Sequence, residues 1–177
     1  MRAYKFLARG GVAPISGLAW PLPDAGAPGA WLEASGPLSA CGAGLHVCAP
    51  ADLAHWLSDE LWQVETAGEA LAGIDCTVVR RARLVRRVGS WSEGGASRFL
   101  AASIAHAEEA LGPGAAPELR GFLDDARLSA QARYFAVGAY CTALAVARHL
   151  APSEPEAAYR KERLWQSTWL ERELLQS

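Results

Sequence analysis

The pattern of apolar residues changes near residue 90, and this change limits the possible folds more than any other feature. Before it, short apolar runs are separated by turns rich in glycine and proline, which is typical of β-strands. From Ser97 onward, apolar residues recur with helical spacing in alanine-rich segments. Because strands and helices occupy separate halves of the chain, the sequence predicts an α+β protein and argues against a doubly wound parallel sheet.

The expected architecture is a single domain spanning all 177 residues, with a sheet-rich half at 1–90 and a helical half at 91–177. The sheet is expected to be small and mainly antiparallel, and to be covered by a layer of three to four helices. Strands are predicted at 4–7, 17–20, 30–33, 45–48, 61–66 and 76–88, a short helix at 51–58, and longer helices at 97–111, from Pro117, at 129–150 and at 156–175. We expect Trp62 and Val64 to pack against the helices that carry Tyr134, Val137, Leu144, Trp165 and Trp169.

The segment Cys41–Cys48 holds three side chains capable of chemistry within eight residues. Gly42 and Gly44 allow a sharp turn, after which residues 45–48 alternate as a strand would. This alternation places His46 and Cys48 on the same face of the strand.

Three interpretations of this segment are open. Cys41, His46 and Cys48 could bind a metal ion such as zinc, with water or Cys76 as the fourth ligand. His46 could instead hold Cys48 as a reactive thiolate, with Glu65 as an orienting or acidic group. The cysteines could also simply pack as small apolar side chains, which is common for free cysteine.

Five arginines fall within eight residues at Arg80, Arg81, Arg83, Arg86 and Arg87. One interpretation is a solvated edge strand, in which charge prevents pairing with another sheet. The other is a phosphate or nucleic-acid contact, because arginine suits phosphate oxygens, with Arg81, Arg83 and Trp62 as candidate ligand-binding residues. No glycine-rich phosphate loop accompanies the cluster.

Composition excludes several functional classes. The net charge of −2 gives no basic excess for nucleic acid, which makes a nucleic-acid partner unlikely. No secretory signal is visible, so we expect a cytoplasmic protein with reduced thiols. The longest apolar stretch, at 134–146, is shorter than the ~20 residues that cross a bilayer, so no membrane association is expected. Seven tryptophans supply large rigid apolar surfaces for a core or a ligand pocket.

The N-terminal half resembles a group of uncharacterised bacterial and phage proteins. The resemblance is carried by the C-x-x-G-x-H segment from Cys41 to His46 and by the L-W-x-V-E strand from Leu61 to Glu65, and it covers about residues 4–88. The group has no established activity, so the resemblance implies no substrate. Cys48 and the alanine- and arginine-rich composition suit actinobacterial members.

A second, topological likeness is to part of the ADP-ribosyltransferase fold. It involves the strand G-L-H-V-C, a short helix with Ala54 and Trp56, and the returning strand L-W-Q-V-E. In that fold such elements line an NAD cleft. Only His46 matches the catalytic set loosely, and the placement of Glu65 on a strand does not establish its role, so the likeness concerns the fold alone.

Three functions follow as hypotheses. The first is a module that binds a small molecule or a protein partner without catalysis, favoured because no complete catalytic set is visible. The second is an enzyme that uses His46 and Cys48, with Glu65. The third is a metalloprotein with Cys41, His46 and Cys48 as ligands. The cofactor and the oligomeric state are not determined by the sequence.

Overall fold

The computed structural model describes residues 3–40 and 42–175 of the chain. The chain divides into two compact units, Met1–Trp91 and Ser92–Ser177, within one residue of the expected boundary between the sheet-rich and helical halves. All described strands lie in the first unit and all described α-helices in the second. The α+β class with segregated strands and helices is therefore confirmed.

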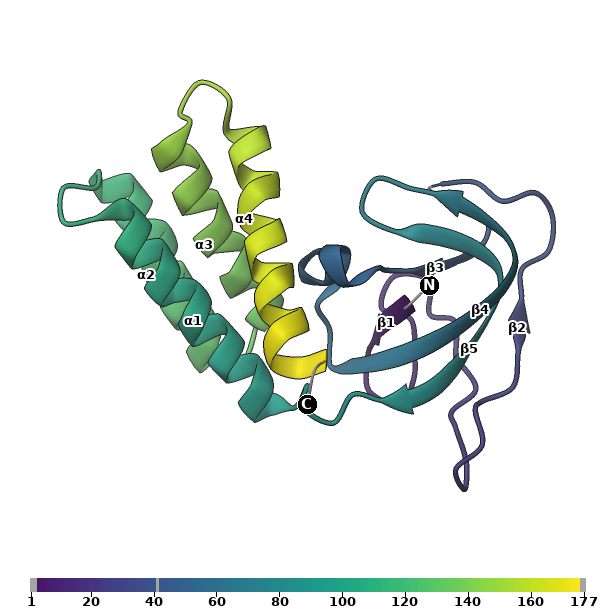
Figure 1. Ribbon diagram of the computed structural model, residues 1–177. Coiled ribbons are helices and arrows are strands. Elements are labelled where there is room, and N and C mark those ends of the chain that lie inside the picture. The colour runs from purple at the N-terminus through teal and green to yellow at the C-terminus, as the bar shows by residue number, and fades with distance from the viewer. Residues whose placement is uncertain (1–2, 41, 176–177) are drawn as a thin grey trace. The chain divides into compact units, whose positions relative to one another are not determined.

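The first unit is built on a five-stranded antiparallel sheet (Figure 1). Its strands are β1 (Ala3–Leu7), β2 (Leu32–Glu33), β3 (Leu45–Val47), β4 (Glu60–Ala72) and β5 (Thr77–Arg87). They follow the order β1-β4-β5-β2, and β3 also pairs with β5, farther along the same strand. A 3₁₀ helix, η1 (Pro50–Trp56), joins β3 to β4.

The β4–β5 hairpin is longer than the sequence predicts. The strand expected at 61–66 was predicted to end at Gly68, but β4 continues to Ala72. Gly68 takes a φ of 78°, and the register with β5 shifts between Ala67 and Ala70. A bulge of this kind lets a strand bend without ending, which explains the difference.

Two expected strands are reduced. The segment 17–20 makes only an isolated bridge between Val12 and Ala19, with Trp20 N–H donating to Gly11 O at 2.9 Å. The segment 30–33 is shortened to the two residues of β2. Prolines at 21, 23 and 28 remove backbone donors around these segments and limit their pairing.

The core of the first unit contains Trp62 and Val64 together with Trp20, Leu45 and Leu84. This cluster consists of strand and loop residues of the first unit, and the segment that contains Ala13 and Trp20 contributes to it. The expected packing of Trp62 and Val64 against the helices stays a prediction.

The second unit contains α1 (Glu93–Leu111), α2 (Pro117–Gln131), α3 (Phe135–Leu150) and α4 (Pro155–Leu170), followed by a π-helical turn, η2 (Glu171–Leu175). The Ser92 hydroxyl caps α1 by accepting from Gly95 N–H at 3.3 Å. Helix α3 contacts each of the other three α-helices. None of the described helices combines the length and the apolar character needed to cross a bilayer.

The predicted start of the helix at 129–150 is wrong. Ser129 lies inside α2, and α3 begins at Phe135, after Arg133 takes a left-handed φ of 63°. Tyr134 and Val137 are 66 % and 52 % exposed, although they were expected in the core. The buried side of α3 carries small residues such as Ala139, Ala143 and Ala147, which allow close helix packing and leave the larger side chains outside.

Trp165 and Trp169 were expected to be buried, but both are only partly buried. Trp165 stacks on His106 with the ring centroids 3.8 Å apart, and His106 Nε2 lies 3.0 Å from Glu162 Oε2. Trp169 packs beside Phe99 at 5.6 Å. Trp165 and Trp169 therefore lie at the edge of the helical core and do not fill its interior.

Candidate functional site

The first unit contains a cavity of about 620 Å³. Its walls are mainly apolar and aromatic, formed by Phe6, Ile15, Leu18, Trp20, Trp56 and Ile74. Its polar side chains are Lys5, Ser16, His46, His55, Asp75 and Cys76. Large apolar walls with a few polar groups are typical of small-molecule sites.

The cavity lies where the pairing between β1 and the β3 segment stops. Tyr4 and Cys48 exchange two backbone hydrogen bonds, each 2.9 Å long. If the antiparallel pairing continued, Phe6 and His46 would be the next two residues to exchange backbone hydrogen bonds. No bridge joins these two described residues. Both line the cavity, and their backbone polar groups face the gap because alternate residues point the same way.

Lys5 brings an amine into this mainly apolar space. It lies between Ala3 and Leu7, two core residues on the same side of β1, with Nζ 5.6 Å from the centre of the Trp20 ring. Burial lowers the pKa of Lys5, and the nearby Cys48 and Cys76 partly oppose this effect. Among the described residues, no hydrogen bond or ion pair to Nζ is found, and its one described contact is with the Trp20 ring.

His55, Trp56 and Asp75 fix the opposite part of the lining. Trp56 Nε1–H donates to the backbone oxygen of Asp75, and His55 Nδ1 lies 3.7 Å from Asp75 Oδ2. These contacts tie η1 to the turn between β4 and β5. The one carboxylate among the described lining residues thus lies beside an imidazole.

Trp20 has a buried indole N–H without an acceptor among the described residues. The side chain is 3 % exposed and lines the cavity. A buried donor without a partner costs free energy, and an acceptor brought by a ligand is one way to satisfy it.

His46 and Cys48 project from the same side of the β3 segment, as the alternation predicts. Both line a small space of about 10 Å³ next to the main cavity, together with Lys5. His46 Nε2 lies 3.4 Å from Ala40 O, and Cys48 Sγ donates to Tyr4 O at 3.4 Å. Burial raises the pKa of the Cys48 thiol to about 12, an effect that the nearby Lys5 only partly offsets. This environment therefore disfavours a reactive thiolate at Cys48.

We expect Cys48 to resist alkylation in the folded protein. With a pKa near 12 instead of 9.0, the thiolate fraction at pH 8 is about a thousandfold smaller. Iodoacetamide at pH 8 should modify Cys48 at least ~100-fold more slowly in the native protein than in urea, as peptide mass spectrometry can measure. Equal rates in the two states would restore the activated-thiol hypothesis.

Glu65 and Trp62 are not brought to the cavity. Glu65 lies on β4 opposite Arg83, with 2.6 Å between Arg83 Nη2 and Glu65 Oε2. Trp62 is buried in the core and donates from Nε1 to Glu60 Oε2 at 3.1 Å. The combination of His46, Cys48 and Glu65 as one catalytic set therefore has no geometric support.

The arginine cluster lies on β5, which pairs with β4 on one side and with β2 and β3 on the other. The edge-strand interpretation is therefore wrong for the part of β5 from Thr77 to Ala82, which is paired on both sides. Among the described strands, Arg83, Arg86 and Arg87 have a partner only in β4. Each of the five arginines interacts with a side chain on a neighbouring segment. Four form ion pairs with glutamates and one forms a hydrogen bond with a glutamine: Arg80 with Glu69, Arg81 with Glu33, Arg83 with Glu65, Arg87 with Glu60, and Arg86 with Gln63. Arg81 and Arg83 also lie 5.0 and 4.6 Å from the Trp31 ring centre.

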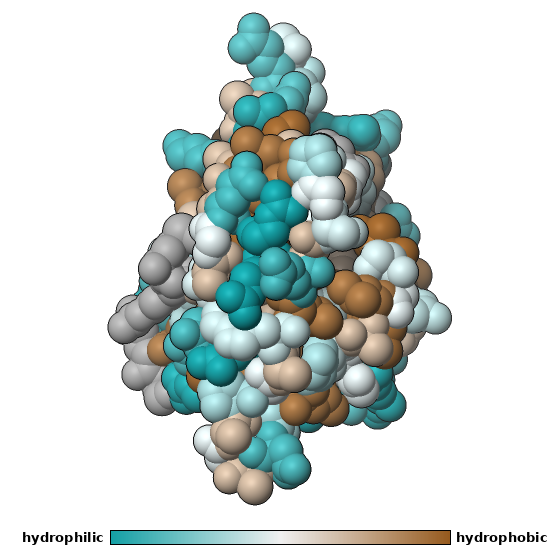
Figure 2. Space-filling view, turned by 90° about the vertical axis from the view of Figure 1, so that its right-hand side faces the viewer, coloured by the Kyte–Doolittle hydropathy of each residue, from teal (hydrophilic) through white to brown (hydrophobic). Residues whose placement is uncertain are grey.

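The surface seen from the side of β2 carries many hydrophilic residues, with hydrophobic patches beside them (Figure 2). The arginines contribute to a hydrophilic surface, but carboxylates offset their charge. A phosphate would have to displace these carboxylates, so the geometry gives the proposed ligand role of Arg81, Arg83 and Trp62 little support.

The metal hypothesis depends on Cys41, which lies outside the described residues. Among those that are described, no group of three or more His, Cys, Asp and Glu side chains is arranged to hold a metal ion. The set of Cys41, His46 and Cys48 stays a prediction.

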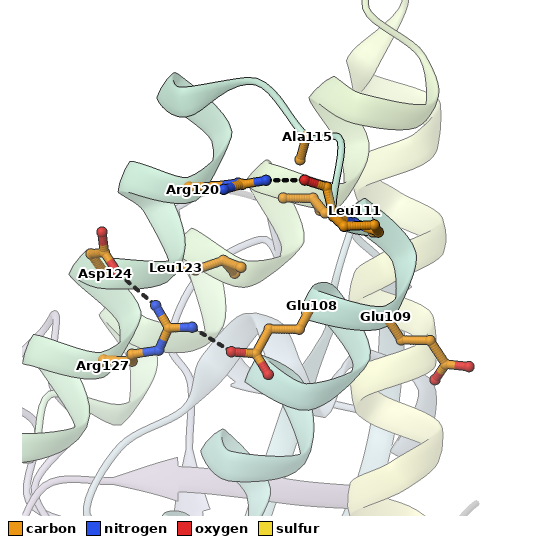
Figure 3. A pocket seen from close by; sticks show the side chains of 10 residues that line it. Glu108, Glu109, Leu111, Ala115, Arg120, Leu123, Asp124 and Arg127 are labelled. Carbon is orange, nitrogen blue, oxygen red and sulfur yellow. Dashed lines mark hydrogen bonds and ion pairs between the residues drawn. The ribbon is translucent and has the colours of Figure 1, made fainter.

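The second unit has a cavity of its own, about 690 Å³, where α1 is followed by α2 (Figure 3). Arg127 lies between Glu108 and Asp124 and bonds to both, and Arg120 donates to Pro113 O. Glu109 points away from this network in Figure 3. Because both arginines already have acceptors from the same walls, this cavity offers little to a charged ligand.

Lys5, Trp20, Trp56, His55, Asp75 and Cys76 were not named together by the sequence analysis. They come from four separate segments of the first unit that the fold brings to one cavity. One signal was present, because Lys5 is one of only two lysines in the chain.

Comparisons with models of protein families, with curated proteins and with solved structures found no match for this chain. The resemblance to the bacterial and phage group stays a prediction, and the candidate site rests on its own geometry: an apolar cavity with one available amine.

Proposed function

We propose that the first unit binds a small, mainly apolar molecule that carries an electron-rich oxygen group at one end. The observation that carries this proposal is the position of Lys5, whose amine has no described hydrogen-bonding partner inside a 620 Å³ aromatic cavity. A ligand with a carboxylate or carbonyl oxygen would give that amine an acceptor while its apolar part occupies the walls.

The other polar groups of the cavity support the same choice. His46 and His55 can donate hydrogen bonds, and the Trp20 indole lacks an acceptor. The backbone N–H and C=O of Phe6 both face the gap between β1 and β3. The two side-chain groups of the cavity without a described hydrogen-bonding partner, the Lys5 amine and the Trp20 indole N–H, are donors, which favours a ligand that accepts hydrogen bonds.

The exposed apolar residues around the cavity support an apolar ligand body. Ile15 and Ile74 line the cavity and are 87 % and 85 % exposed. Large apolar side chains held in water next to a pocket are a common feature of binding sites. We also propose that the protein works in the cytoplasm, where thiols such as those of Cys48 and Cys141 remain reduced.

The test uses three eight-carbon ligands that differ only at the polar end: octanoate, octanol and octylamine. Isothermal titration calorimetry at pH 7 should show the tightest binding for octanoate and the weakest for octylamine. Lys5→Met should weaken octanoate binding by about 10–100-fold, the effect of losing a hydrogen bond to a charged group. Methionine has a similar length and is suited to a buried site, so the variant should remain folded.

Lys161→Met is the matched control, because Lys161 lies on α4 and is exposed. It should leave octanoate affinity unchanged. The proposal fails if octylamine binds as tightly as octanoate, or if Lys5→Met binds octanoate as the unmodified protein does.

A further inference from the structure

Almost all of the positively charged side chains in this protein are arginines. Of 17 Lys and Arg residues, only Lys5 and Lys161 are lysines. An arginine keeps its proton under all ordinary conditions, whereas a lysine can lose it and become a nucleophile. One of the two lysines is exposed on α4, and the other lines the cavity of the first unit.

The surroundings of Lys5 favour the neutral form of the amine more strongly than the surroundings of an exposed lysine would. Its flanking core residues Ala3 and Leu7 and the Trp20 ring limit the water around Nζ. Burial is the largest influence on the pKa of Lys5 and lowers it. The absence of an ion pair or hydrogen bond to Nζ within the described chain leaves the nitrogen lone pair unobstructed once the proton is lost.

We propose that Lys5 captures an apolar aldehyde as a reversible imine inside this cavity. The amine nitrogen attacks the carbonyl carbon, and the carbonyl oxygen takes up a proton to give a carbinolamine. The nitrogen loses both of its protons in the course of the reaction, the oxygen leaves as water that carries two protons, and a C=N bond remains. His46 lines the same cavity and can exchange these protons, and hydrolysis reverses the reaction without any oxidant or reductant.

This inference rests on the proposed ligand-binding function, because it assigns a chemical class to the oxygen-bearing end of the ligand. An aldehyde has the acceptor oxygen that the cavity favours and adds an electrophilic carbon. The cavity walls would hold its apolar chain and bring the carbonyl to Nζ, which raises the effective concentration of the reacting groups.

The experiment uses octanal with sodium cyanoborohydride, which reduces an imine to a stable secondary amine. Intact mass and peptide mapping then report modification at Lys5, at Lys161 and at the N-terminal amine of the same molecule. At pH 7 we expect Lys5 to be modified at least ~10-fold faster than Lys161, because burial lowers the pKa of Lys5 and the cavity holds the aldehyde next to Nζ.

Two controls test whether the reaction takes place inside the cavity. Octanoate should slow the modification of Lys5 and leave that of Lys161 unchanged. Lys5→Arg should abolish the fast modification, because arginine retains the positive charge but offers no amine. Equal rates at the two lysines, or a rate at Lys5 that octanoate does not change, would overturn the proposal.

The two proposals fail in different ways. If octanoate binds and Lys5→Met weakens it, but Lys5 reacts no faster than Lys161, the imine is rejected and the ligand-binding function stands. If octanoate does not bind and Lys5 is not selectively modified, both are rejected.

Discussion

Replacing Phe99 with alanine is expected to lower the free energy of unfolding by about 3–5 kcal/mol, the range for removing a large buried aromatic side chain. Phe99 lies on α1, is 0 % exposed and packs beside Trp169 with the ring centroids 5.6 Å apart. Truncation leaves a cavity in a close-packed region, where neighbouring side chains can relax only in part. Urea denaturation followed by circular dichroism at 222 nm reports this helical unit directly.

The matched control for Phe99→Ala is Leu164→Ala on α4. Leu164 is 52 % exposed, so its removal should change the free energy of unfolding by less than ~1 kcal/mol. A domain of this size has only about 5–15 kcal/mol of stability in total, so the difference between the two variants should be plain. If both variants had the same urea midpoint, Phe99 would not be part of the helical core.

The sequence predicted the α+β class because the spacing of apolar residues changes only once, near residue 90. Strand lengths were harder to predict, since Gly68 looks like a strand end but here forms a bulge in β4. The start of α3 was missed because Ser129 resembles a cap, while the actual break depends on the left-handed backbone of Arg133. Both errors concern single residues whose role is decided by tertiary pairing.

Tryptophan burial was overestimated for a related reason. Helical spacing places Trp165 and Trp169 on one side of α4, but it does not reveal how far that side extends into the core. The buried positions of α4 include Gln166 and Ser167, and Gln166 Nε2 donates to Ala139 O at 2.9 Å. Helix α4 therefore turns Gln166 and Ser167 inward, and Trp165 and Trp169 are only partly buried.

The candidate site was predicted only in part. Alternation along 45–48 correctly places His46 and Cys48 on one side, but it does not reveal that the other wall is β1. Lys5 and His46 are 41 positions apart in sequence, and both line the cavity because the bridge between Tyr4 and Cys48 joins β1 directly to the β3 segment. The arginine cluster was the most conspicuous charge pattern in the sequence, yet carboxylates and an amide on neighbouring segments match it in the folded unit.

Gly44→Ala is the substitution in the first unit for which we expect the largest effect on both stability and ligand binding. Gly44 precedes β3 with a φ of 134°, a backbone conformation that residues with a side chain rarely adopt. An added Cβ would lie 2.1 Å from Val78 Cγ1, and Val78 is the partner of His46 in the β3–β5 register. Backbone strain and overpacking together should lower the free energy of unfolding by about 2–5 kcal/mol.

The contact with Val78 also links Gly44 to the ligand site. Relief of the clash requires β3 to move away from β5, and this movement carries His46, which lines the cavity. Octanoate affinity measured by calorimetry should therefore fall together with the urea midpoint. Gly89→Ala is the matched control, because an added Cβ there meets nothing within 4 Å and the backbone is not left-handed; it should change the free energy of unfolding by less than ~1 kcal/mol. A Gly44→Ala variant as stable as Gly89→Ala would show that β3 is not held against β5 at this position, and the cavity would then lose the wall on which the ligand proposal depends.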